Sequence, residues 1–556
     1  MELWARSIPG LILAVSALAA PAITPRGIVN NASYSYVGLP NSSIALGSLF
    51  AIFGTELGPA VLEQVRAFPL RTEFGGTSVR VTMADGATVD ALVVYTSAGQ
   101  VGAILPSNTP TGSGRVVVTY RGQPSPPEPV TIVRNSPGIF ARNEQGSGAA
   151  AAQHINTPGL PVNALNQVAR PGEVIDLWVT GLGPVVGNEA AGPLPFVPIG
   201  VDQVEVYVGG RRAETTYIGR SGCCAGLDQV RFRVPAGVEG CYVPVAVRAG
   251  GVTSNFTTIS VAASGSYCAD ATGFTRAEVE RLLTAGSVVV GVADLKKVTV
   301  KLSQGVNNTD SGSGGFLRYD ATRLVASAHW FVGPPPPGSC NVTLYRGVGG
   351  STADALRFDA LDAGVALNLS GPRGESAIGR QPDLTYSGKL GGGPQLPGDP
   401  PPEEYLLPGA YSMNNGAGGA GVGVLRASMT LPSGFTWSNQ DSINLVPRAQ
   451  DLTITWSGGD PSREYVTVTG ESARGTGTNT VGAVFRCIER ASAGRITVPS
   501  LVLSVLPATA QPVGTGVGTL AVSASPARET VFFNAAGINA GYFLYTLQHT
   551  KDVNYQ

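Results

Sequence analysis

The side chains of this chain that are most able to form covalent bonds are six cysteines. Four lie close together and two lie in the C-terminal half: Cys223, Cys224, Cys241, Cys268, Cys340 and Cys487. An even number of cysteines in an exported chain favours disulfides. We expect a Cys340–Cys487 bond and two bonds within the first four, whose partners stay open and include a vicinal Cys223–Cys224 bond. Zinc is not favoured, because its structural sites use C-x2-C cysteine pairs or nearby histidines, whereas here the cysteine spacing is wrong and the three histidines are scattered.

The sequence contains no complete motif for a nucleophile elbow, a zinc protease helix, a P-loop or a dinucleotide-binding fold. Gly374–Gly379 is one residue away from an elbow, but no helix pattern follows it, so we expect a loop. A Ser–His–Asp triad could be built from His154 or His329, but only the residue types support it. The adjacent carboxylates of Glu403-Glu404 point apart on an extended chain, so we expect them to be solvated. No catalytic residue is predicted.

Two further groups of side chains could bind a ligand. Asn307–Gly314 is rich in oxygen ligands, but it lacks the ordered aspartates and the closing glutamate of an EF-hand. We therefore expect a flexible loop there, with calcium as the weaker alternative and no other cofactor or metal. Trp437, Tyr405 and Tyr411 lie in turn-rich stretches. They are candidate glycan contacts if their rings are exposed, and ordinary packing is the alternative.

The composition limits the fold class and the partners. The 556 residues correspond to about three or four domains. Only 13% of the residues are charged and the net charge is −1, whereas soluble chains average about 25% charged residues. Nucleic acid is therefore not an expected partner. Gly 74 and Pro 41, together with many Val, Thr and Ser residues, indicate short strands and many turns.

Residues 1–22 are predicted to be a cleaved signal peptide. An apolar run from Ile8 to Ala20 follows Arg6, and the small residues of Ala17–Ala22 fit two cleavage sites. The run is shorter than the roughly 20 residues that span a bilayer comfortably. We therefore expect a secreted or cell-surface protein, with no transmembrane segment in the mature chain.

The first half of the chain contains an internal duplication. Gly47–Pro59 returns as Gly172–Pro184 at an offset of 125 residues. Gln100–Pro106 returns as Gln229–Pro235 at an offset of 129 residues. The second copy therefore carries extra residues between the two matched blocks, most naturally in Gly219–Gly226, which holds two of the cysteines. The repeated sequence itself is interpreted as scaffold, a strand that leads into a tight turn.

Each copy has the strand and turn density of an immunoglobulin-like β-sandwich. The predicted fold class is all-β: tandem sandwiches at 24–134 and 135–264, one short connecting helix, and a larger β-rich domain at 288–556. A Pro/Gly-rich stretch at 391–402 is a possible subdivision of that domain. A Cys340–Cys487 bond would tie its two sides together, so we expect one composite domain.

The connecting helix is predicted at 275–285, within a linker at 265–287. Thr275 and Glu278 have the spacing of a capping box, in which each side chain bonds the backbone N–H of the other residue. In the C-terminal domain, the alternation of apolar residues on either side of a turn over 452–468 predicts a β-hairpin.

Several short sequences in the first half form a specific set: Asn31–Ser33, Gly47–Pro59, Ser136–Phe140, Arg170–Glu173, Thr180–Pro184 and Gly226–Pro235. Together they resemble a module of exported β-sandwich proteins of Acidobacteria such as Solibacter. The C-terminal half is similar to a partner region of such proteins at Leu407–Tyr411, Trp456–Gly459 and Thr497–Pro507. The resemblance implies an exported protein with transcription-factor-immunoglobulin-like domains, and it supplies no catalytic residues.

Three functional hypotheses follow. The leading one is an exported, non-catalytic structural or adhesive protein that associates with itself or with surface polysaccharide. The second is an extracellular carbohydrate-binding protein, and the third is an enzyme with an unrecognised site in the C-terminal domain. Assembly predicts exposed apolar sheet edges, sugar binding predicts exposed aromatic rings, and an enzyme predicts a deep pocket with convergent acids or a histidine.

Overall fold

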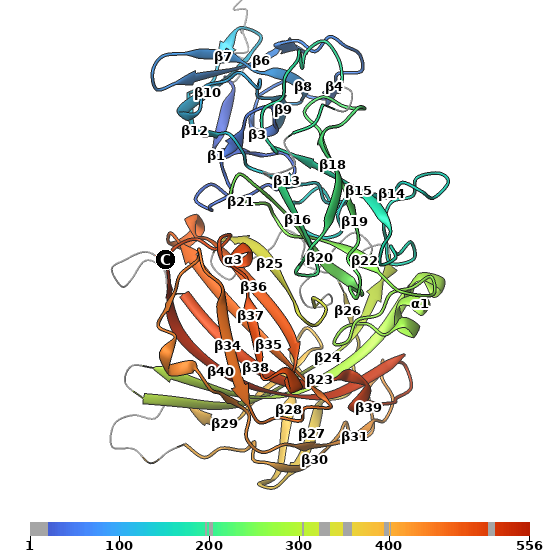
Figure 1. Ribbon diagram of the computed structural model, residues 1–556. Coiled ribbons are helices and arrows are strands. Elements are labelled where there is room, and N and C mark those ends of the chain that lie inside the picture. The colour runs from blue at the N-terminus through green and yellow to red at the C-terminus, as the bar shows by residue number, and fades with distance from the viewer. Residues whose placement is uncertain are drawn as a thin grey trace, which may run out of the picture.

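The computed structural model describes residues 20–194, 197–199, 204–302, 305–321, 334–347, 358–393, 400, 402–509 and 518–556. Most of the predicted signal peptide and His329 lie outside these residues. The described chain consists mainly of strands, with two short α-helices, α1 (Arg276–Ala285) and α3 (Ser500–Leu503), which confirms the predicted all-β class. Neither helix has the length and apolar character needed to cross a membrane. Figure 1 shows the first module at the top, the second in the middle and the C-terminal domain below.

The first module is a sandwich of two sheets. Its strands are β1 (Ala22–Asn30), β2 (Ile44–Ala45), β3 (Leu49–Thr55), β4 (Glu63–Gln64), β5 (Glu73–Phe74), β6 (Thr77–Met83), β7 (Thr88–Asp90), β8 (Leu92–Thr96), β9 (Gln100–Ile104), β10 (Gly112–Tyr120), β11 (Gln123–Pro124) and β12 (Glu128–Val133). One sheet has the order β1-β3-β9-β8-β4 and the other β2-β12-β10-β6-β5, with β7 on β6 and β11 on β10. Val79, Val81 and Met83 of β6 are buried between the sheets, whereas Arg80 is exposed. This period of two buries one face of the strand and leaves the other in water.

The second module repeats this arrangement. Its strands are β13 (Gly138–Ile139), β14 (Ala152–His154), β15 (Val174–Thr180), β16 (Val204–Val208), β17 (Arg211–Arg212), β18 (Glu214–Arg220), β19 (Asp228–Arg233), β20 (Gly240–Ala249), β21 (Val252–Thr253) and β22 (Thr257–Val261). The sheets have the orders β13-β15-β19-β18 and β17-β16-β20-β21, with β14 on β15 and β22 on β20. The repeated sequence forms β3 and β15, and these two strands begin and end at equivalent residues of the two copies.

One connection between equivalent strands is longer in the second copy. Residues 97–99 join β8 to β9 in the first module, whereas residues 221–227 join the corresponding strands β18 and β19 in the second. The longer connection contains a Cys223–Cys224 disulfide. It is where the sequence comparison places the extra residues of the second copy.

The linker is fixed by the predicted helix and by a second disulfide. Thr275 Oγ1 accepts a hydrogen bond from the backbone N–H of Glu278, and the Glu278 carboxylate accepts one from the backbone N–H of Thr275. Gly286 ends α1 in the left-handed conformation, at φ 77°. Cys268, just before the helix, is bonded to Cys241 of β20. The disulfide therefore ties the start of the linker to the second module.

The C-terminal domain is formed around one large sheet. The strands of the domain are β23 (Ser287–Leu302), β24 (Gly305–Asp320), β25 (Ser339–Arg346), β26 (Asp359–Ala360), β27 (Ala366–Gly371), β28 (Gly374–Gly379), β29 (Tyr386–Gly393), β30 (Gly409–Asn414), β31 (Arg426–Leu431), β32 (Thr436–Trp437), β33 (Leu445–Val446), β34 (Leu452–Ser457), β35 (Glu464–Arg474), β36 (Val481–Arg490), β37 (Arg495–Val498), β38 (Gly518–Pro526), β39 (Phe532–Phe533) and β40 (Ala540–Tyr555). The large sheet has the order β25-β36-β35-β38-β40-β23-β24-β26, with β29 on β24 and with β33 and β39 on β40.

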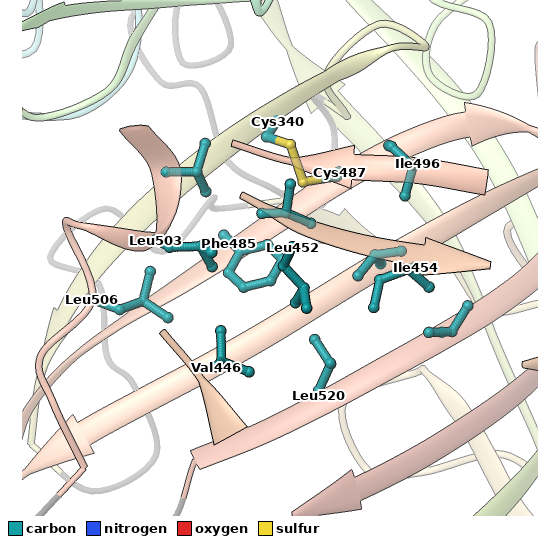
Figure 2. Close-up of a cluster of buried hydrophobic side chains, with 14 of the residues drawn as sticks. Cys340, Val446, Leu452, Ile454, Phe485, Cys487, Ile496, Leu503, Leu506 and Leu520 are labelled. Atoms are coloured by element: carbon teal, nitrogen blue, oxygen red, sulfur yellow. A yellow bond between two sulfur atoms is a disulfide. The ribbon is translucent and has the colours of Figure 1, made fainter. Parts of the chain in front are cut away.

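Two smaller sheets cover the large one. They have the orders β28-β27-β30-β31 and β32-β34-β37, and each shares an apolar cluster with strands of the large sheet. Figure 2 shows one of these clusters around the Cys340–Cys487 disulfide, which joins β25 to β36. The first and last strands, β23 and β40, pair in parallel. Strands from both sides of 391–402 therefore lie in one sheet.

Three local predictions for this domain are wrong. The stretches 307–314 and 374–379, expected as loops, lie within β24 and form β28, because each pairs in register with a neighbouring strand. The hairpin predicted over 452–468 does not form, since β34 pairs with β37 while β35 pairs with β36 and β38. The apolar residues of β34 and β35 instead meet across two packed sheets.

We expect the double substitution Cys340→Ala and Cys487→Ala to lower the unfolding free energy of the C-terminal domain by about 2–5 kcal/mol. The bond restrains a separation of 147 residues in the unfolded chain, and long loops gain most from a cross-link. The control is Cys223→Ala with Cys224→Ala, whose separation of 1 closes no loop. Thermal unfolding under non-reducing conditions compares the two. Equal melting temperatures of the two double variants would contradict the prediction.

Candidate functional site

A buried ion-pair network crosses the joint between the two modules. Arg220, the last residue of β18, has a side chain that is only 1% exposed. Its Nη1 lies 2.7 Å from Asp228 Oδ1, and its Nη2 lies 3.2 Å from Glu189 Oε1. Glu189 Oε2 accepts a hydrogen bond of 2.8 Å from the backbone N–H of Ser107 in the first module. One arginine of the second module therefore orders a carboxylate that binds the first.

Burial raises the pKa of Asp228 from 3.8 to about 6, against the opposing charge of Arg220. The other carboxylate oxygen, Oδ2, accepts a hydrogen bond of 3.0 Å from the backbone N–H of Leu182. The carboxyl group is thus ionised at neutral pH and takes up a proton in mildly acidic solution.

Both copies of the repeated sequence take part in this joint, the first through Leu49 and the second through Thr180. Thr180 Oγ1 accepts a hydrogen bond from the backbone N–H of Leu49 (2.9 Å) and donates one to the carbonyl of Gly226 (2.7 Å). Gly226 has φ 71°, and a Cβ there would lie 2.8 Å from Ile104 of the first module. The longer connection of the second module therefore needs a glycine where it packs on the first. In the first copy the equivalent threonine, Thr55, is exposed.

A recess of about 590 Å³ opens beside the network, between the two modules. Polar and apolar residues share its lining: Asp90, Ser107, Asn108, Asn188, Glu189, Val89, Leu92 and Val185. Ser107 Oγ accepts a hydrogen bond from the backbone N–H of Val185. No histidine lies among the described residues that line the recess.

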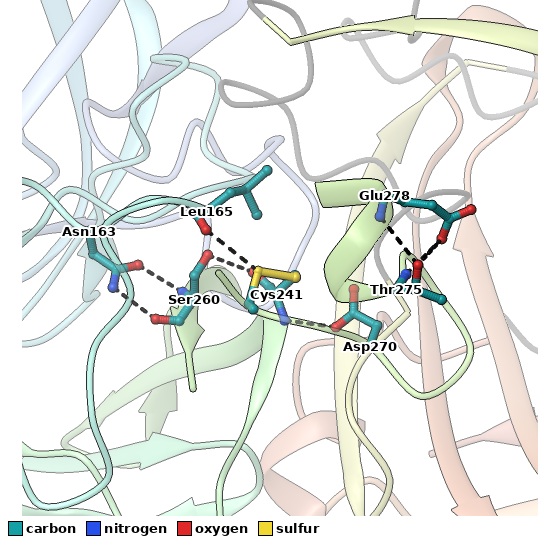
Figure 3. Close-up of a disulfide and its surroundings, with 8 residues drawn as sticks. Asn163, Leu165, Cys241, Ser260, Asp270, Thr275 and Glu278 are labelled. Carbon is teal, nitrogen blue, oxygen red and sulfur yellow. Dashed lines mark hydrogen bonds between the residues drawn. A yellow bond between two sulfur atoms is a disulfide. The ribbon is translucent and has the colours of Figure 1, made fainter. Parts of the chain in front are cut away.

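A second junction joins module 2 to the C-terminal domain. Figure 3 shows Asp270 Oδ1 accepting a hydrogen bond from the backbone N–H of Cys241, which measures 2.7 Å. Ser260 Oγ donates to the carbonyl of Cys241 (2.9 Å). The Tyr542 hydroxyl of β40 donates to Glu278 of α1 (2.8 Å). Burial raises the pKa of Asp270 to about 7. An apolar cluster that includes residues of module 2, the linker and the C-terminal domain completes the junction.

The three candidate glycan contacts are buried, so they do not form the exposed platform that sugar stacking needs. Trp437, Tyr405 and Tyr411 are 2%, 7% and 2% exposed. The Trp437 ring N–H donates to Asn439 Oδ1 (2.9 Å), and the Tyr411 hydroxyl donates to the carbonyl of Tyr405 (3.0 Å). Their rings belong to the apolar clusters between the packed sheets.

The calcium candidate stretch uses one of its carboxylate oxygens within the fold, whereas Asn307 Oδ1, Asn308 Oδ1 and Asp310 Oδ1 are buried without a hydrogen-bond partner. Asp310 Oδ2 accepts hydrogen bonds from the backbone N–H groups of Tyr405 (2.7 Å) and Leu406 (2.8 Å). Lys297 Nζ, opposite Asp310 on β23, lies 2.6 Å from Glu404 Oε2, so an ammonium group already supplies positive charge here. Glu404 is therefore paired and not fully solvated, in contrast to the expectation. Across the described ranges, no three His, Cys, Asp or Glu residues gather as a metal-binding group.

The two histidines within the described residues make structural contacts. His154 is buried, with Nδ1 2.6 Å from Glu173 Oε1 and Nε2 3.0 Å from the carbonyl of Gln167. His549 Nε2 lies 3.0 Å from the carbonyl of Phe435. Neither ring is presented to a hydroxyl nucleophile by these contacts. Sequence reasoning missed Arg220 and Glu189, although the position of Arg220 within the extra connection of the second copy was a usable signal.

No family model matches the chain, and no curated protein matches it. Among solved structures, the chain is similar to a tetra-tandem repeat in the extending region of a large adhesion protein, with 13% identity over 96% of this chain and 99% of that chain and a TM-score of 0.13. It is also similar to domains 4–9 of the surface layer protein SbsC, with 9% identity over 94% and 83% and a TM-score of 0.17.

A third similar structure is SGBP-B of the Bacteroides ovatus mixed-linkage glucan utilization locus, solved in complex with a mixed-linkage heptasaccharide. The identity is 12% over 87% of this chain and 90% of that chain, with a TM-score of 0.13. TM-scores this low carry no argument about function. The all-β class follows from the strands and sheets themselves.

The substitution Arg220→Met should destabilise the chain by about 3–5 kcal/mol, because it leaves the buried carboxylates of Asp228 and Glu189 without their cation. Arg80→Met is the control: the Arg80–Asp90 pair is exposed at 63% and 43%, and exposed pairs contribute about 1 kcal/mol or less. Denaturant unfolding and limited proteolysis measure both variants. If the two variants lose amounts of unfolding free energy that differ by less than about 1 kcal/mol, the joint has no special stabilising role.

Asp228 should give a defined pH dependence. Because its folded-state pKa lies above 3.8, the folded chain binds this proton more tightly than the unfolded chain between about pH 4 and 6. Its contribution to the unfolding free energy is therefore greatest below about pH 4 and declines by up to about 3 kcal/mol as pH rises through 6. Asp228→Asn should lack this slope. Denaturant midpoints at several pH values test it, and parallel curves for wild type and variant would refute it.

Proposed function

We propose that the chain is an exported, non-catalytic structural or adhesive protein of the cell exterior, of the Acidobacterial type that its sequence resembles. The observation that carries the proposal is an exposed apolar sheet edge on the first module of a firmly jointed chain. Val61, Leu62 and Phe68 are 77%, 59% and 42% exposed. They flank β4, the edge strand of the first module. Exposed apolar edge strands are sites of association between chains.

The backbone of this edge is suited to pairing with another strand. Glu63 and Gln64 pair with β8 on the inner side, and the N–H of Val65 donates to the carbonyl of Val94 (2.9 Å). Hydrogen-bonding directions alternate along a strand, so the N–H groups of Gln64 and Arg66 point away from the sheet. A strand of a second chain could bond to them while its side chains cover the apolar residues.

Both junctions support a role that depends on a fixed shape. The network at Arg220 holds the first module on the second, and the Cys241–Cys268 bond with its surrounding apolar cluster holds the second on the C-terminal domain. The exposed edge therefore belongs to the module that lies farthest from the C-terminal domain (Figure 1). Three disulfides support export, because such bonds persist mainly in oxidising compartments.

The mature chain, produced from about residue 23, is expected to self-associate at micromolar concentration. The substitution Leu62→Glu should weaken this association by about tenfold or more, because it buries a charge at the contact. Thr88→Glu adds the same charge on another exposed strand of the same module and serves as the control. Sedimentation velocity and electron microscopy measure the assembly, and fractionation of an exporting host locates the chain. A strict monomer that does not remain at the cell surface would refute the proposed function.

A further inference from the structure

The recess between the modules has the size and position of a small-molecule site. Its volume is about 590 Å³, and its walls come from β7, the start of β8 and residues 106–108 of the first module and residues 185–190 of the second. Ligand pockets in proteins measure about 300–1,000 Å³ and often lie between domains. The network at Arg220 fixes the wall that the second module contributes, because Glu189 belongs to both.

The recess presents hydrogen-bond donors and acceptors together. Asn188 Oδ1 accepts the backbone N–H of Ala190 (3.0 Å), which leaves its Nδ2 free to donate. Ser107 Oγ accepts the backbone N–H of Val185 (3.1 Å), which leaves its hydroxyl hydrogen to donate. Asn108 is exposed and offers an amide that both donates and accepts. Groups of both kinds suit hydroxyls, each of which donates one hydrogen bond and accepts others.

The charges of the recess exclude strongly ionic ligands. Asp90 is held by Arg80 at 2.7 Å and 3.2 Å, and Glu189 is held by Arg220. Each carboxylate therefore already has its counter-ion and retains lone pairs that can accept from a hydroxyl. Among the described residues that line the recess there is no lysine or arginine to attract an anion.

Apolar side chains form another part of the recess lining. Val89, Leu92 and Val185 contribute to the same lining, and a sugar ring presents an apolar C–H face as well as a set of hydroxyls. We propose that the inter-module recess binds a glycosyl unit of a neutral polysaccharide. The proposal rests on the proposed function, since it names the surface to which an exported adhesive chain would attach.

The test uses the whole mature chain and a panel of soluble, uncharged gluco-, xylo-, manno- and galacto-oligosaccharides. Wild type should bind at least one of them by isothermal titration. The double variant Asn108→Ala with Asn188→Ala should bind it about tenfold or more weakly, because each amide contributes hydrogen bonds to hydroxyls. Asn188→Trp should block the recess. Asn166→Ala, which removes an exposed amide elsewhere in the second module, should bind as wild type does.

Two results would overturn the inference: no binding to any oligosaccharide of the panel, or binding that the recess variants leave unchanged. Unfolding curves of the variants separate lost binding from lost folding. Sedimentation of the same preparations separates this inference from the proposed function. Assembly without sugar binding would remove the recess site alone, whereas a monomer that binds sugar through Asn108 and Asn188 would keep the site and remove the structural role.

Discussion

The buried guanidinium of Arg220 is the constraint on which the upper half of the molecule depends. Asp228 is fully buried and Glu189 is 8% exposed, and two carboxylates can be removed from water only where a cation and backbone N–H groups compensate them. One arginine meets both, and Ser107 and Leu182 supply the N–H groups. Few orientations of the two modules could satisfy all these partners. The same interaction that stabilises the joint therefore sets the direction in which the first module points.

Duplication explains how such a joint can arise. Both copies keep the strand that the repeated sequence encodes, because its apolar residues face the sandwich core in each. What changed is a connection farther along each module: residues 221–227, between β18 and β19, reach the first module, while the shorter residues 97–99, between β8 and β9, do not extend in this way. Thr55 stays exposed in the first copy, and Thr180 becomes a bridge between modules in the second. An identical residue thus gains a new role from the different loop beside it.

The sequence could predict the face that a strand buries, but not the strand beside it. Alternation at Ile454 and Val466 identified two core strands correctly, yet the turn between them leads from one sheet to another and forms no hairpin. Weak strand propensity at 307–314 was overridden by pairing along the whole of β23. The capping box at Thr275 was predictable because all its partners lie within four residues. Burial of Trp437 was not, since the sheet that covers it comes from distant sequence.

Each junction contains a buried carboxyl group whose pKa is raised, and the two junctions differ in what surrounds that group. In the lower junction Asp270, with a pKa of about 7, lies beside a disulfide and an apolar cluster, neither of which titrates. In the upper joint the central carboxyl group has a pKa near 6, so mild acidification protonates it and, because the folded chain binds this proton more tightly, raises the unfolding free energy. Protonation of Asp228 removes its attraction to Arg220 and leaves Glu189 as the partner of that cation. Glu189 also lines the recess. Because Glu189 is paired with the Arg220 guanidinium, a hydrogen bond that Glu189 makes to a ligand is coupled to the orientation of the first module on the second. Any ligand that orders Glu189 would consequently stiffen the joint, and a stiff joint would in turn present a better formed recess.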